Sequence, residues 1–213
     1  MKILITGANF ENKGAQSMLF ITADEIRKRA GNAEIYFSTS EKCNLRNYRF
    51  KSVYLTTLTQ KIALSKHYIS LPLIKNTLRD CIRFILGRKK NIWQFTRLRE
   101  LMPDIDVIID VSGFALGQKW SAGSQEDYLN NIRIAKKYNI PMYLMPQSFG
   151  GFSYSDDKKY LLPEIKELLK YPRVIFAREQ AGYTELTKRF RLNNVKLSTD
   201  LVLQNKSIEL SNI

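Results

Sequence analysis

The chain has 213 residues, which fits one α/β domain or two very small ones and is long enough to bury a core. Its 44% hydrophobic and 25% charged residues exclude a largely disordered chain. No apolar run reaches the ~18 residues of a membrane-spanning helix, and the N-terminal apolar stretch is too short for a signal peptide. Two cysteines, Cys43 and Cys81, do not make a disulfide framework, so we expect a cytoplasmic protein.

The net charge of +14 is concentrated in one part of the chain. Residues 41–100 carry fourteen basic and three acidic side chains, whereas the segments on either side are close to neutral. A basic block of this kind attracts phosphates, anionic lipid or nucleic acid, and charge alone does not choose among them.

The first forty residues predict a βαβ unit. Residues 2–6 are a short apolar run that ends at Gly7, which is typical of a buried parallel strand. From Ala15 the apolar residues recur at helical spacing, and Gly31 ends that helix. Residues 33–38 then form a second strand.

The next sixty residues are harder to interpret. Residues 41–75 show no clean period, and residues 76–101 predict a basic helical stretch that Gly87 divides into two helices.

After Pro103 short strands and helices alternate. We expect a helix behind the capping pattern of Ser124 and Asp127, and a polar, frayed tail from residue 204. The strands are expected at 107–110, 141–145, 174–177 and 195–198, and two further helices at 163–171 and 179–190. This alternation predicts a Rossmann-like α/β fold, with a parallel sheet and helices on both faces.

Polar or glycine residues follow each of the strongest predicted strands. In open parallel sheets, ligands bind beyond the carboxyl ends of the strands, so these loops are the candidate site. The loops are residues 7–14, 110–114, 146–150, 178–179 and 199–200.

The first loop matches neither a dinucleotide fingerprint nor a P-loop. Asn12, Lys13 and Gly14 lead into the predicted helix, where free backbone N–H groups and the positive helix end can bind an anion. The alternative is a turn glycine beside a solvated lysine.

The later loops also leave alternatives open. Asp110 can orient a substrate hydroxyl or cap its own loop, and Gly113 and Gly117 allow close backbone approach. Gln147 and Ser148 suit sugar hydroxyls, with a turn around residues 150–151 as the alternative.

Arg178 can bind a phosphate or carboxylate, or it can pair with Glu179. His67 is the only histidine and lies away from the strand ends, so we expect a surface or packing role and no metal site. The sequence also lacks a nucleophile elbow.

Four segments together resemble the polysaccharide pyruvyl transferase family over residues 1–200. They are residues 12–15, Asp106 to Gly117 with its Asp-x-x-x-Asp-x-Ser-Gly-Phe-Ala-Leu-Gly pattern, residues 146–150, and residues 176–179 followed by Asp200. The resemblance implies two Rossmann-like halves, similar to those of GT-B glycosyltransferases, of which residues 1–200 are the N-terminal one with a basic insertion at 41–101.

The implied reaction transfers pyruvate from phosphoenolpyruvate to two sugar hydroxyls as a ketal, in the synthesis of a cell-surface polysaccharide, with no separate cofactor. On this resemblance we assign anion binding to Arg178 and the Asn12–Gly14 loop. The side chains assigned to the sugar or to the shape of the cleft are Asp110, Gln147 and Ser148, and Gly113 and Asp200 complete the predicted substrate-binding set. The catalytic acid and base stay unassigned.

The sequence also departs from the family pattern. Family members continue into a second α/β half that carries an Arg/His-containing motif, whereas residues 201–213 are only a tail or the start of such a half. We therefore expect either a truncated protein or a degenerate relative, and an isolated chain without activity.

The basic stretch 76–101 interleaves arginines and lysines with Trp93, Phe95 and isoleucines. This pattern is typical of a helix at an anionic membrane surface, which suits a lipid-linked saccharide acceptor at the inner face of the plasma membrane. The alternative is a solvated helix packed on the sheet. Two other functions stay open: a GT-B-like glycosyltransferase that uses a nucleotide sugar, and a nucleic-acid binder, although no nucleic-acid recognition motif is present.

Overall fold

The computed structural model describes residues 1–40, 45, 47–66, 74 and 97–213. Its centre is an eight-stranded sheet in which every strand pair is parallel, as the sequence predicts. The main path runs β3-β2-β1-β4-β6-β7-β8, and β5 pairs with β6 beside it. The strands are β1 Lys2–Thr6, β2 Glu34–Thr39, β3 Lys51–Tyr54, β4 Val107–Asp110, β5 Phe114–Gly117, β6 Met142–Gly150, β7 Val174–Ala177 and β8 Val195–Leu197.

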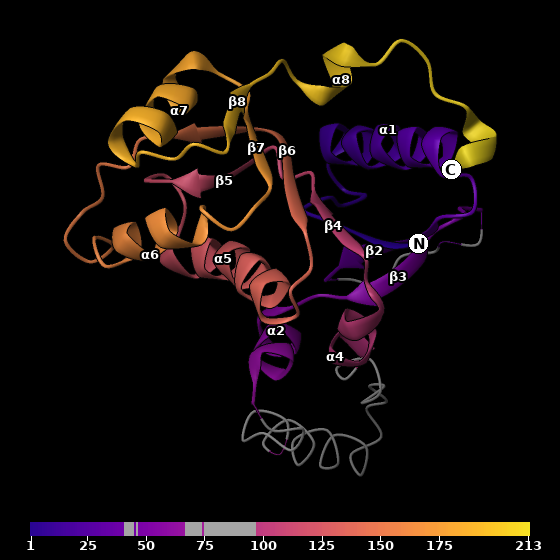
Figure 1. Ribbon diagram of the computed structural model, residues 1–213, viewed down its shortest axis with the longest axis horizontal. Helices are drawn as coiled ribbons and strands as arrows, with labels where there is room; N and C mark the ends of the chain where they lie inside the picture. The colour runs from indigo at the N-terminus through magenta and orange to yellow at the C-terminus, as the bar shows by residue number, and fades with distance from the viewer. Residues whose placement is uncertain (41–44, 46, 67–73, 75–96) are drawn as a thin grey trace.

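Helices cover both faces of the sheet, which confirms the predicted Rossmann-like α/β class (Figure 1). Helix α1 (Lys13–Arg29) lies on one face, and α2 (Thr57–Leu64), α5 (Ala122–Lys137) and α6 (Leu161–Leu168) lie on the other. Helix α7 (Gln180–Thr184) continues into a π-helical turn, η3 (Glu185–Arg189). The remaining short elements are α4 (Arg97–Leu101), η2 (Met102–Asp104), α8 (Leu201–Gln204) and η4 (Leu210–Asn212).

Successive residues of a strand belong to two separate hydrophobic clusters, one on each face of the sheet. Leu4 packs with the cluster under α5 and α6, whereas its neighbour Ile5 packs with the cluster under α1. Because side chains alternate across a strand, each inner strand must be apolar on both faces, and this explains the continuous apolar runs.

The strand order reverses direction between β1 and β4. From β1 the chain moves outward through β2 and β3, and from β4 it moves the other way through β6, β7 and β8. This reversal is a topological switch point, where a crevice opens at the carboxyl ends of the strands. We call that side of the sheet the carboxyl edge.

Two predicted loops are strands instead. Residues 146–150, predicted as a loop, are the second half of β6. Strand β5 begins at Phe114, the last residue of the predicted loop 110–114, and continues through residues 115–117, for which no element was predicted. The pairing of β6 with β7 shifts register between Leu144 and Gln147, which accommodates Pro146, a residue without an N–H to donate.

The segment 41–75, which shows no period, also contains regular structure. Strand β3 buries only Val53, so its pattern is too weak to recognise. Helix α2 begins with a capping box between Thr56 and Thr59. The two helices predicted on either side of Gly87 lie largely outside the described residues, as does His67.

The predicted starts of α1 and α5 and the predicted frayed tail are wrong. Helix α1 begins at Lys13 with Asn12 as its N-cap, and α5 begins behind Ser121 rather than at the Ser124 pattern. The tail is not frayed: Asn212 donates to Asp24 of α1 at 2.8 Å, and Ile213 is buried against the α1 cluster.

Candidate functional site

The ends of β1 and β4 touch each other at the switch point. Gly7 follows β1 with a φ of 81°, and a Cβ on it would lie 2.6 Å from the backbone nitrogen of Ser112. Only glycine adopts this conformation and permits this approach without strain. The glycine at the end of β1 therefore positions the two polar loops on either side of the switch point.

The carboxylate of Asp110, the last residue of β4, is fully buried next to this contact. Asp110 accepts hydrogen bonds from the Thr6 hydroxyl at 2.7 Å and from the Ser112 backbone at 3.0 Å. Gln147 approaches it from β6, with a longer Nε2–Oδ1 distance of 3.5 Å. Of the two roles that the sequence left open for Asp110, the structure shows the cap of the following loop.

Burial raises the pKa of Asp110 above its ordinary value, and the hydrogen bonds from Thr6 and Ser112 offset only part of this effect. Tyr128 of α5 extends the network by donating to Gln147 Oε1 at 3.0 Å. Burial, and then the nearby Asp110, raise the pKa of Tyr128 well above its ordinary value. Its phenol therefore stays protonated at neutral pH.

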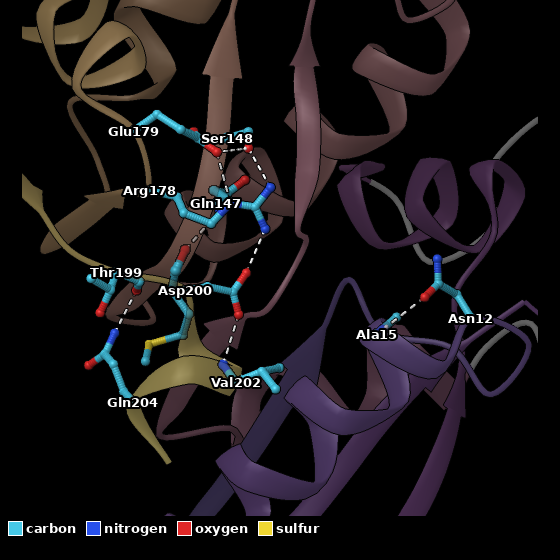
Figure 2. A network of polar contacts seen from close by, with 11 residues as sticks. Asn12, Ala15, Gln147, Ser148, Arg178, Glu179, Thr199, Asp200, Val202 and Gln204 are labelled. Carbon is cyan, nitrogen blue, oxygen red and sulfur yellow. Dashed lines mark hydrogen bonds and ion pairs between the residues drawn. The ribbon is translucent and has the colours of Figure 1, made fainter.

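A second polar cluster surrounds Arg178, at the end of β7 (Figure 2). Its guanidinium donates to Glu179 at 2.9 Å, to Asp200 at 2.6 Å and to the Ser148 hydroxyl at 2.6 Å. Burial alone would lower the pKa of Arg178, but the two carboxylates outweigh it and raise that pKa. Of the two interpretations of Arg178, the ion pair with Glu179 is the one present, and Asp200 joins it.

The Asn12–Gly14 segment stands apart from the Arg178 cluster (Figure 2). The Asn12 side chain accepts from the N–H groups of Gly14 at 2.8 Å and Ala15 at 3.2 Å. Two of the backbone donors that we expected to be free for an anion, those of Gly14 and Ala15, are thus occupied by the N-cap. Lys13 extends along the helix and donates to Gln16 at 3.3 Å.

The two glycines of the β4–β5 segment have structural roles. The carbonyl of Gly113 accepts from Ser148 N at 2.9 Å, and Gly113 packs against Met18 of α1. Gly117 has a φ of 158° beside the Gly150 carbonyl. Within the part of the chain that the structure describes, no group of three or more His, Cys, Asp or Glu side chains could hold a metal ion.

A polar cavity of about 540 Å³ opens at the carboxyl edge, between the strand ends and helices α2 and α5. We call it the carboxyl-edge cavity. The loop after β1 and the end of β2 form one wall, Ser112 and Ala115 form part of the floor, and α2 and α5 close the other side. Its polar side chains are Asn9, Glu11, Ser38, Thr39, Ser40, Thr56, Thr57, Gln60, Ser112, Ser124, Asp127, Tyr128 and Asn131.

None of the cavity residues was among the nine predicted site residues, although residues 7–11 and Ser112 lie in the predicted loops 7–14 and 110–114. Asp127, Tyr128 and Asn131 share one face of α5, and Gln60 of α2 donates to Asn131 at 2.8 Å. The polar side chains of Asp127, Tyr128 and Asn131, close together on α5, are the sequence signal that could have identified this side of the cavity. The α2 side could not be predicted because the helix itself was missed.

A larger hollow of about 670 Å³ lies elsewhere, between α1 and the C-terminal segment. Apolar side chains such as Ile21, Ile109 and Met145 supply most of its surface, and the lining also includes the cations Lys28, Arg29 and Lys206. It lies against the α1 face of the sheet rather than at the switch point. We therefore take the smaller, polar carboxyl-edge cavity as the candidate site.

The protein-family model for polysaccharide pyruvyl transferase matches residues 12–213 of this chain. The chain belongs to the polysaccharide pyruvyl transferase family. No curated protein matches the chain by sequence similarity. Membership of this family supports a transferase function, and the Rossmann-like sheet is consistent with it. Among the described residues, no helix is long and apolar enough to cross a membrane.

Proposed function

We propose that the protein takes part in transferring pyruvate from phosphoenolpyruvate to two hydroxyls of a sugar, as a ketal, and that the carboxyl-edge cavity binds the acceptor sugar. The observation that carries this proposal is the family match over residues 12–213. The position of the cavity at the switch point, where open α/β sheets bind ligands, supports the second part.

The chemistry of the cavity wall supports a neutral, hydroxylated ligand. Its described lining residues include hydroxyls, amides and the carboxylates of Glu11 and Asp127, but no lysine or arginine. Such groups donate to and accept from sugar hydroxyls, whereas the carboxylates repel a phosphate. The lining therefore favours the sugar over phosphoenolpyruvate as the occupant.

The donor needs a different environment. In ketal formation C3 of the enol accepts a proton, one sugar hydroxyl adds to C2, phosphate leaves C2, and the second hydroxyl adds in its place, each hydroxyl losing its proton. Cations must therefore face the phosphate and carboxylate of the donor. Arg178 stays our candidate for this role. Because Glu179 and Asp200 both contact its guanidinium, donor binding requires at least one of them to release it.

Ligand binding by NMR tests the acceptor site. Methyl glycosides of galactose, glucose and mannose are titrated into the isotope-labelled chain, beside phosphoenolpyruvate and a uridine-diphosphate sugar. We expect at least one glycoside to shift the amide signals of residues 7–11 and 127–131. A nucleotide sugar that shifts these signals while the glycosides do not would instead support the glycosyltransferase alternative and contradict the proposal.

The donor is tested separately by mixing phosphoenolpyruvate with a glycoside that binds and measuring both released phosphate and the pyruvylated sugar. Product carrying a pyruvate ketal supports the reaction and would contradict the expectation, drawn from the sequence, that the isolated chain is inactive. Phosphate release that is the same without a sugar would contradict coupling between donor and acceptor.

A further inference from the structure

Tyr128 is the buried residue through which the carboxyl-edge cavity meets the Asp110 network. It lines the cavity from α5, and its hydroxyl lies 3.0 Å from Gln147 Oε1. A phenol has one proton to donate and an oxygen that also accepts. Which of the two the Tyr128 oxygen can still offer to a ligand depends on which way the Gln147 amide is turned.

The surroundings of Gln147 determine that orientation. Its Nε2 lies 3.5 Å from Asp110 Oδ1 and 3.5 Å from the backbone carbonyl of Met145. Both neighbours are oxygens that accept, so the NH₂ group must face them. Turning the amide over would place its carbonyl oxygen against two other acceptors in a buried site, which is unfavourable. The Gln147 carbonyl therefore faces Tyr128.

This orientation does not depend on whether Asp110 is ionised. Ser112 N donates to Asp110 Oδ1 at 3.0 Å, so this oxygen is already an acceptor. If Asp110 carries a proton, Oδ2 can hold it, where the Thr6 hydroxyl lies at 2.7 Å and can accept it. In both states Oδ1 accepts from Gln147.

Tyr128 must consequently give its only proton to Gln147. We propose that the Tyr128 oxygen faces the cavity, presents only its lone pairs there and thereby selects a sugar hydroxyl that donates a hydrogen bond. This inference rests on the proposed function, since it names a specificity-determining residue for the acceptor sugar.

The neighbouring side chains on α2 and α5 are consistent with this distribution of protons. Thr57 gives its proton to Asp127 Oδ2 at 2.8 Å, so its oxygen is also left to accept. Asn131 accepts from Gln60 with its oxygen at 2.8 Å, which leaves its NH₂ group as a donor. The side of the cavity formed by α2 and α5 thus offers acceptors at Tyr128 and Thr57 and a donor at Asn131, a pattern that suits a ligand with several hydroxyls.

Deoxy and deoxyfluoro sugars distinguish the two roles of Tyr128 in the unaltered protein. For the methyl glycoside that binds, each ring hydroxyl is replaced in turn by hydrogen and by fluorine, and the dissociation constant is measured by NMR titration. Fluorine can accept weakly but cannot donate. At the position that contacts Tyr128 we expect both analogues to bind about three- to tenfold more weakly than the parent.

Variants then assign that position to Tyr128. Tyr128→Phe should weaken the parent glycoside by the same factor and leave no difference between the parent and the two analogues at that one position. Gln147→Met releases the Tyr128 proton, so the fluoro analogue should then bind more tightly than the deoxy analogue. Tyr160→Phe, at an exposed tyrosine outside the cavity lining, is the control and should change none of these constants.

The outcomes separate this inference from the proposed function. If no glycoside binds, the acceptor site and this inference are both overturned. If glycosides bind and Tyr128→Phe retains the affinities of the unaltered protein for parent and analogues, only the role of Tyr128 is overturned. The same follows if the fluoro analogue binds as well as the parent at the position that Tyr128→Phe affects, because Tyr128 would then be a donor.

Discussion

Arg178 Nη1 lies 2.6 Å from Asp200 Oδ2, and this ion pair connects the end of β7 to the N-cap residue of α8. The pair is partly shielded from water, since the side chains of Arg178 and Asp200 are 31% and 22% exposed. The same guanidinium reaches Ser148 of β6. Arg178 therefore holds together three segments that are far apart in the sequence.

We expect the Arg178–Asp200 pair to contribute measurably to stability. A double-mutant cycle with Arg178→Met and Asp200→Asn should give a coupling energy of about 1 kcal/mol in urea unfolding, after allowing for partial solvent screening. The pair Lys170–Glu167, at 2.6 Å but with both side chains more than half exposed, is the matched control. A coupling no larger than that of the control would contradict the structural role of Arg178.

The contact between Gly7 and Ser112 gives a second prediction. Gly7→Ala should lower the free energy of unfolding by about 2–4 kcal/mol, because alanine is strained at positive φ and its Cβ collides with Ser112. Gly123→Ala is the control: nothing lies within 4 Å of the added Cβ, and alanine favours the helix. Equal effects of the two changes in urea unfolding would show that Gly7 does not make this contact.

The buried Asp110 predicts a pH dependence of stability. Its pKa is raised in the folded state, so the unfolded chain releases this proton at lower pH than the folded chain does. Ionisation of Asp110 therefore opposes folding increasingly as the pH rises from about 4, and the effect levels off above the folded pKa. Asp110→Asn does not titrate.

The stability of Asp110→Asn relative to the unaltered protein should consequently increase between pH 4 and pH 8, as measured by urea unfolding. Leu203→Ala, which changes an exposed and uncharged side chain, supplies the baseline. A relative stability of Asp110→Asn that falls with rising pH would mean that the Asp110 carboxylate is stabilised by its surroundings.

The C-terminal segment predicts a contrast between two apolar residues. Ile213 is 5% exposed and packs against the α1 cluster, whereas Leu210 is 82% exposed. Ile213→Ala should lower the free energy of unfolding by about 2 kcal/mol, and Leu210→Ala by less than about 0.5 kcal/mol. Similar small effects of both changes would show that the segment is not packed on α1 in solution.

The fold could be predicted from the sequence where strands are apolar on both faces. The runs at β1, β4 and β7 are unambiguous because parallel central strands are buried on both sides. Strand β3 could not be predicted, because it lies at the edge of the sheet and only Val53 is buried. The extension of β6 past Pro146 depends on a shift in register, which no local pattern indicates.

The candidate site could be predicted only in part. In a parallel sheet the carboxyl ends of the strands lie on the same side, so the strand-end residues were predicted to lie near one another. Two clusters form at this carboxyl edge: Asp110 with Gln147, and Arg178 with Ser148. The sequence could not predict whether Arg178 is free to bind a ligand or forms an ion pair, because the residues around it along the chain are the same in both cases. The wall formed by α2 and α5 depends on tertiary packing.

The most direct test of the acceptor site combines binding with a variant that fills the cavity. Ala115 lines the carboxyl-edge cavity, so Ala115→Trp should fill it, while Ala181→Trp places the same side chain on α7, away from the lining. After circular dichroism confirms that both variants fold, methyl glycosides are titrated into each and followed by NMR. We predict that Ala115→Trp abolishes glycoside binding and that Ala181→Trp retains it. Unchanged binding to Ala115→Trp, with shifts at residues other than those of the cavity, would contradict the account.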